Sequence, residues 1–155
     1  MNNFANSKFA TFDLNMIKSK LTHPEEGEGW TDAFANSVEG DYRRFLYLNA
    51  KYKNATLVPS KLVDTFWHAH ILDTRKYAHD SGDLFGEFFH HFPYFGIRGD
   101  DDEVRHREAF VETQKLWLRE FGTVQDAHTG IEFSGKAATC KGICCCDLIA
   151  LVKIA

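Results

Sequence analysis

The chain has 155 residues, 44% hydrophobic and 26% charged, which fits one globular domain and leaves little sequence for a second core. A net charge of −4 and a pI near 6.0 disfavour a nucleic-acid-coating function, which needs concentrated Lys and Arg on one face. No apolar run approaches the ~20 residues of a transmembrane helix, and no signal-peptide pattern opens the chain, so we predict a cytoplasmic protein.

The first third of the chain predicts three helices. Residues 12–21 carry apolar side chains at helical spacing, and His23-Pro24 is expected to end that helix. Apolar residues recur at every fourth position over 30–38, and aromatic residues are frequent over 42–52. Because Gly40 weakens the continuity between these two segments, we assign them to separate helices.

The middle of the chain predicts the longest well-marked helix. Ser60 is the expected N-cap, and helical periodicity then runs to about His79. A short helix over 83–90 is expected to follow. Asp101 or Asp102 can cap a last long helix, with Gly122 at the position after its end. The fold class is therefore all-α, a single helical bundle or array of about five helices.

The end of the chain differs in composition from this helical domain, which we place at residues 1–122. Residues 123–139 lack an apolar period and are interpreted as a flexible linker. The tail, residues 140–155, holds all four cysteines: Cys140, Cys144, Cys145 and Cys146. Disulfides that staple a fold would be spread through it, so we expect a reduced tail. The four thiols could bind a soft ion such as Cu(I) or Zn(II), cross-link chains, accept a lipid or be modified as a peptide.

Histidines concentrate in one segment. Five of the eight lie within it: His68, His70, His79, His90 and His91. Neutral imidazole is the commonest ligand of transition metals, so this density suggests a site. Helix geometry puts His70 on the apolar stripe with Trp67 and Tyr77, and puts His68 beside Asp64 on nearly the opposite side. His68 and His70 therefore cannot chelate one ion in a regular helix.

Two candidate sites remain. One takes His70 with Tyr77, and His90 or His91 arriving from the next helix. The other takes Asp64 and His68, a pair at i, i+4 that can share a metal or form an orienting hydrogen bond, with His79 extending the row. The alternative without a site makes His70 a hydrogen-bonded core residue and Asp64–His68 an exposed ion pair of ~0.3–0.5 kcal/mol.

The segment also carries a family resemblance. The stretch Val63–Asp80 with its Trp67-His68-Ala69-His70 motif, followed by Gly86 and by His90 or His91, resembles the glycine-rich domain-containing protein-like family. The continuation from His90 to Gly96 is similar to its small bacterial members. The resemblance covers residues 59–99, and more weakly 12–122. It implies an α-helical domain and a motif centred on Asp64, Trp67, His68, His70, Tyr77, Asp80 and His91. Where the family pattern often has a cysteine this chain has Ser81, so that thiol ligand is not available.

The leading hypothesis is a small metal-binding protein, in one version a metalloenzyme, with Zn, Fe or Cu as the candidate ion. His68, His70 and His90 or His91 would then be ligands or acid–base groups. Asp64 would orient His68, and Tyr77 would donate a proton or position a substrate. One alternative is a non-catalytic protein-interaction module with a structural His/Tyr/Trp core. Another is a soft-metal carrier or modified peptide through the tail cysteines. The expected partner is a protein or a small molecule.

Overall fold

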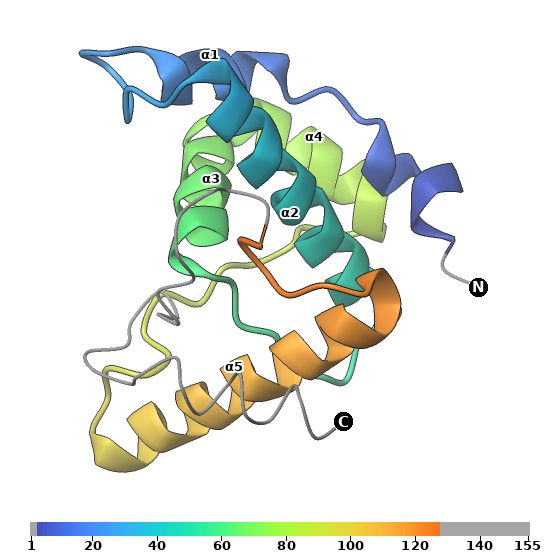
Figure 1. Cartoon of the computed structure of the whole chain (residues 1–155), viewed down its shortest axis with the longest axis vertical. Coiled ribbons are helices and arrows are strands. Elements are labelled where there is room, and N and C mark those ends of the chain that lie inside the picture. Colours follow the sequence, from blue (N-terminus) through green and yellow to red (C-terminus); the bar gives the residue numbers. More distant parts are fainter. Residues whose placement is uncertain (1–2, 128–155) are drawn as a thin grey trace.

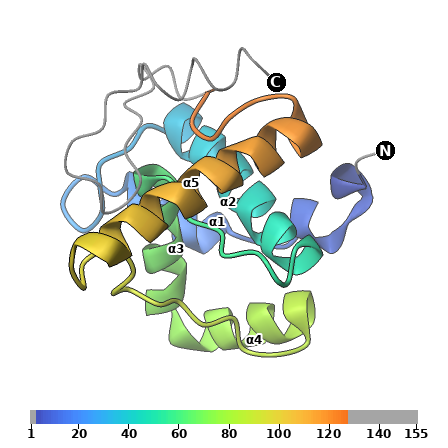
Figure 2. The same ribbon diagram turned by 90° about the horizontal axis from the view of Figure 1, so that it is seen from below.

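A computed structural model describes residues 3–127, and over that range the regular elements are all helical. Two short 3-10 helices are followed by five α-helices: Phe4–Asn6, Lys8–Ala10, α1 (Asn15–Thr22), α2 (Asp32–Lys51), α3 (Lys61–Leu72), α4 (Thr74–Phe85) and α5 (Asp100–Phe121). Figure 1 shows α1 to α4 packed together, with α5 crossing the opposite end of the molecule. In Figure 2 α5 passes in front of α1 and α2, and α4 lies to one side. The predicted all-α bundle is confirmed.

The core forms where α2 packs against α3. Val38, Tyr42 and Phe45 of α2 are fully buried together with Val63 and Phe66 of α3. Each such side chain contributes roughly 1.5–3 kcal/mol by leaving water. This packing fixes the rotation of α3 about its axis, and so decides which of its side chains face the outside.

The two helices predicted over 30–38 and 42–52 are one helix, α2, so that division was wrong. Gly40 lies inside it, with no heavy atom within 4 Å of the place where a Cβ would be. A helical glycine costs about 1 kcal/mol relative to alanine. Burial of Val38 and Tyr42, which flank it at the same core, outweighs that cost.

The single helix predicted from Ser60 to His79 is also wrong, because the chain breaks at Asp73. Its ψ of 74° is not helical, and its carboxylate accepts a hydrogen bond from the backbone N–H of Lys76 at 3.3 Å, which caps α4. A side chain that caps a new helix offers the backbone an alternative to continuing the old one. His79 therefore lies on α4 and does not extend the Asp64–His68 row.

The short helix predicted over 83–90 is absent, since α4 already contains residues 83–85 and ends at Phe85. Gly86 follows with φ of 82°, a left-handed conformation that glycine adopts at helix ends without steric cost. Residues 86–99, here called the 86–99 loop, then connect α4 to α5. His91 thus belongs to a loop and not to a helix.

The chain beyond α5 returns to the domain. Gly122 ends α5 with φ of 69°, as predicted, and Gln125 is fully buried. The Gln125 side chain accepts a hydrogen bond from the Ser60 backbone N–H at 2.6 Å, and its own backbone N–H donates to Gln114 at 3.1 Å. Gln125 of the predicted linker is therefore buried against the domain, while the boundary at 122 stays a prediction. The cysteine tail lies outside the described residues.

Over residues 3–127, no helix combines the length and the apolar character needed to cross a membrane.

Candidate metal centre

Three potential metal ligands converge between α3 and the 86–99 loop. Asp64 and His68 lie one turn apart on α3, whose first turn is fixed by the Ser60 side chain accepting from the Val63 N–H at 3.2 Å. The His91 Nε2 lies 3.0 Å from Asp64 Oδ1 and 3.1 Å from His68 Nε2. The third side, from His68 Nε2 to Asp64 Oδ1, measures 3.6 Å. Among residues 3–127, Asp64, His68 and His91 form the group of His, Cys, Asp and Glu side chains whose ligand atoms lie close enough together to hold a metal ion.

The spacing of the three atoms fits a metal ion. Ligand atoms around a tetrahedral zinc ion, bound at about 2.0–2.1 Å, lie roughly 3.3 Å from one another. The observed separations of 3.0, 3.1 and 3.6 Å bracket that value. Two imidazoles favour zinc, iron or copper over calcium and magnesium, which prefer oxygen ligands.

The triad Asp64–His68–His91 borders a cleft of about 810 Å³ that lies between α3, the 86–99 loop and α5. The side chains of Asp64 and His91 are 20% and 16% exposed, and that of His68 is 54% exposed. Aromatic and aliphatic side chains form most of the remaining wall, together with charged groups on and before α5: Trp67, Phe89, Phe92, Phe95, Leu57, Val58, Arg98, Arg105, Glu108 and Glu112. An ion held by the triad would keep one side open to this cleft.

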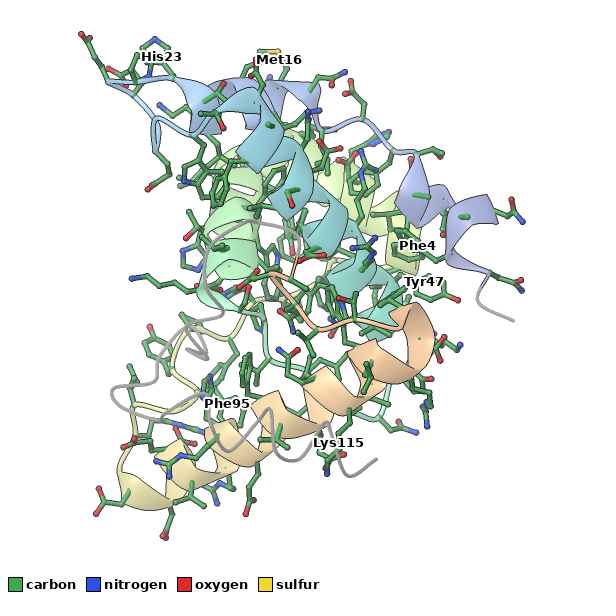
Figure 3. The ribbon with its side chains drawn as sticks, viewed as in Figure 1. Phe4, Met16, His23, Tyr47, Phe95 and Lys115 are labelled. Atoms are coloured by element: carbon green, nitrogen blue, oxygen red, sulfur yellow. The ribbon has the colours of Figure 1, made fainter. Side chains whose placement is uncertain are left out.

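His106 is a cleft residue that the sequence analysis did not select. It lies on α5, is 3% exposed, and its ring packs edge-on against Phe95 at 5.0 Å between centroids. Burial lowers the pKa of His106, and the charges of Asp102 and Asp64 oppose the shift without cancelling it. His106 lies four residues before Phe110, which is buried on the same helix, so helical spacing was the available signal. Phe95, labelled in Figure 3, marks where the 86–99 loop meets α5.

His70 occupies a separate, buried network. Its Nδ1 lies 2.8 Å from the Tyr42 hydroxyl and its Nε2 3.0 Å from Asp80 Oδ2, while Lys76 pairs with the same carboxylate oxygen at 2.8 Å. Burial lowers the pKa of His70, and the Asp80 charge only partly offsets this. A neutral ring with both nitrogens hydrogen-bonded holds the core together. Helix geometry had already placed His70 apart from His68.

The remaining predicted site residues also lie outside the triad. His90 is exposed, with its ring 4.9 Å from that of Phe88. His79 lies on α4, where its Nδ1 is 3.3 Å from Asp80 Oδ1. Tyr77 is buried, and its hydroxyl accepts from the Trp67 indole N–H at 2.9 Å and donates to the backbone carbonyl of Phe89. The structure thus joins the Asp64–His68 pair of one candidate site to the His91 of the other.

Taken together, the fold and the site define an all-α protein with a candidate metal centre of two histidines and one aspartate beside a cleft. A family model described as UCP032817-like matches residues 8–111, which include the whole triad. The chain belongs to this family. The assignment to the glycine-rich domain-containing protein-like family was wrong, because the family model that matches the chain is a different one. No curated protein and no solved structure matched the chain.

Proposed function

We propose that this protein binds one divalent transition-metal ion through Asp64, His68 and His91 and uses the open coordination position in a reaction of a small molecule held in the cleft. The convergence of the three ligand atoms within 3.6 Å of one another carries the proposal. Three protein ligands with an open fourth position is the arrangement of catalytic zinc sites, whereas structural sites are closed by four protein ligands. A zinc ion so held lowers the pKa of a bound water to about 7, which supports hydrolysis at neutral pH.

The cleft supports the enzymatic version of the proposal. Its volume of about 810 Å³ is in the range of small-molecule sites, and aromatic walls with a few polar groups are typical of such sites. His106 lies on the α5 wall, and burial lowers its pKa, which favours the neutral imidazole that a general base requires; it is the candidate proton acceptor in this proposal. All three residues act as ligands in this proposal. His68 and His91 are neutral donors, and Asp64 also supplies negative charge that offsets the charge of the dication.

The rival function, a non-catalytic interaction module, has one observation in its favour. The hydrogen-bonded Tyr42–His70–Asp80 network is the kind of structural core that this hypothesis predicts. That network shares no residue with the triad, so its presence does not argue against a metal. The two functions differ in whether the folded domain holds an ion.

The test is metal content with a matched pair of double variants. Three proteins are purified without chelator, analysed for metals and titrated with Zn²⁺. They are the wild type, the triad variant His68→Ala with His91→Ala, and the control variant His79→Ala with His90→Ala. Both variants lose two histidines from the same segment, but only the first pair belongs to the triad. We expect one equivalent of metal in the wild type and in the control, and none in the triad variant.

Circular dichroism and thermal melts establish that each variant is folded. A folded wild type that takes up no Zn²⁺ would refute the metal site and leave the interaction module as the better function. Full metal occupancy in a folded triad variant would move the site elsewhere in the chain.

A further inference from the structure

The position of His91 needs an explanation, because this ligand lies on a loop. Asp64 and His68 are held by the helical backbone of α3, whereas His91 lies in the 86–99 loop, between the end of α4 and the start of α5. A catalytic or binding group must be held within about 0.5 Å of its working position, which a loop does not provide by itself. Some other part of the fold must therefore hold His91.

A hydrogen bond from α4 holds the loop two residues before His91. The Tyr77 hydroxyl donates to the backbone carbonyl of Phe89 and accepts from the Trp67 indole N–H at 2.9 Å. Tyr77 is 3% exposed; its bond with Trp67 is buried, and its bond with the Phe89 carbonyl is partly buried. Because Trp67 lies on α3, the bonds join the helix that carries two of the ligands to the loop that carries the third.

The Trp67 ring also contacts His91 directly. Its centroid lies 4.3 Å from that of His91 and 5.2 Å from that of Phe89, with the Phe89 ring nearly parallel at 15°. Trp67 comes directly before His68 in α3 and is 6% exposed. One buried indole therefore supports His91 by ring contact while its N–H fixes the tyrosine that holds the loop.

We propose that Trp67 and Tyr77 form a clamp that positions His91 and thereby sets the affinity of the metal site, so that Tyr77 is a positioning residue and not a proton donor to substrate. This inference rests on the proposed metal function and deepens it. Groups that orient a metal ligand typically change metal affinity 10- to 100-fold when they are removed. We expect an effect of that size from the loss of one hydroxyl that touches no metal.

The test compares two variants, each of which removes the hydroxyl group of one buried tyrosine. Tyr77→Phe removes the hydroxyl that holds the 86–99 loop. Tyr42→Phe removes a hydroxyl that is equally buried but bonds His70 at 2.8 Å. The aromatic contacts of Tyr42 are to Phe66 and His70, neither of which belongs to the 86–99 loop. His70 packs edge-on against Tyr77 at 5.0 Å between ring centroids, so Tyr42→Phe loosens the packing beside Tyr77 but leaves the hydrogen bonds of the Tyr77 hydroxyl in place. A purely structural role for Tyr77 predicts that the two variants behave alike.

Three measurements are made on the wild type and both variants of the full chain: the Zn²⁺ Kd by chelator competition, the melting temperature in EDTA, and the visible absorption spectrum with Co²⁺. We expect both variants to melt at lower temperature in EDTA. Only Tyr77→Phe should weaken Zn²⁺ binding, by 10- to 100-fold, and alter the Co²⁺ spectrum, since only it releases His91. If Tyr77→Phe does not fold, Trp67→Phe removes the N–H donor, keeps a stacked ring and should weaken Zn²⁺ binding in the same way.

Equal Zn²⁺ affinity in Tyr77→Phe and the wild type would overturn the clamp while leaving the metal site intact. An equal loss of affinity in Tyr42→Phe would also overturn it, because the effect would then come from general loosening of the core. A wild type that binds no Zn²⁺ is a different result, which overturns the metal site and the clamp together.

Discussion

Asp126 gives the prediction whose magnitude follows most directly from the structure. This carboxyl lies just past the end of α5, where Ser60 Oγ donates to its Oδ1 at 2.9 Å. Its backbone N–H donates to Asp41 Oδ2 at 2.7 Å, which brings two carboxyl groups together. Burial raises the pKa of Asp126 from 3.8 to about 6, and the neighbouring charge of Asp41 adds to the shift against the opposing Ser60 bond.

A raised carboxyl pKa makes the folded protein less stable at higher pH. Below pH 3.8 Asp126 is protonated in both the folded and the unfolded state and contributes nothing. Between pH 3.8 and about 6 the folded state retains a proton that the unfolded state has released, so the free energy of unfolding falls as pH rises. At about 1.4 kcal/mol per pKa unit, the full penalty above pH 6 is about 3 kcal/mol.

Asp126→Asn removes the charge and keeps an oxygen that can accept from Ser60. We expect the variant to exceed the wild type in free energy of unfolding by about 2–3 kcal/mol at pH 7.5, with the difference shrinking toward zero near pH 4. Urea unfolding across this pH range measures it. Asp83→Asn, at an exposed aspartate, is the control for removing a negative charge. A pH-independent difference, or a variant less stable than the wild type at pH 7.5, would refute the reasoning.

Three further predictions concern stability. His70→Ala should lower the free energy of unfolding by about 2–4 kcal/mol at pH 8, because Tyr42 loses its partner and a cavity remains. Since burial lowers the pKa of His70, that loss should shrink as pH falls below 6.5, and urea melts that show an equal loss at pH 5.5 would contradict it. Gly40→Ala should raise the free energy of unfolding by up to about 1 kcal/mol, and with it the melting temperature, since the new Cβ would meet open space. A lower melting temperature would contradict a regular helix at this position. Asp73→Ala should cost about 1 kcal/mol in thermal melts through loss of the α4 cap, and an unchanged melt would show that the cap is dispensable.

Part of the candidate site could be predicted because it depends on one helix. Ser60 as N-cap and the four-residue spacing of Asp64 and His68 are local features, and helix geometry alone puts the two side chains together. The same geometry separates His70 from His68. Wherever the relevant contacts lie within one turn of α3, the sequence pattern is sufficient.

The remaining parts of the candidate site and of the fold depend on contacts between distant segments or on competition between weak local preferences. His91 joins the triad only because the chain turns at Asp73 and again at Gly86, and each break replaces a helix that periodicity alone would continue. The spacing of His106 and Phe110 indicates that His106 is buried, but its position at the cleft depends on the packing of α5 against the 86–99 loop. Gly40 shows the opposite case, in which core burial overrides a local signal to stop.

The return of the chain to Ser60 has a consequence for the order of folding. The Ser60 backbone N–H and Oγ bond to Gln125 and Asp126, which follow it by 65 and 66 residues. Because contacts between such distant positions close a large loop, at a larger cost in chain entropy than a helical turn, we expect them to form after the local helices. During synthesis, the first turn of α3 therefore lacks these partners until the chain has been made past residue 126. The helix that carries Asp64 and His68 thus gains these partners only from residues made after α5.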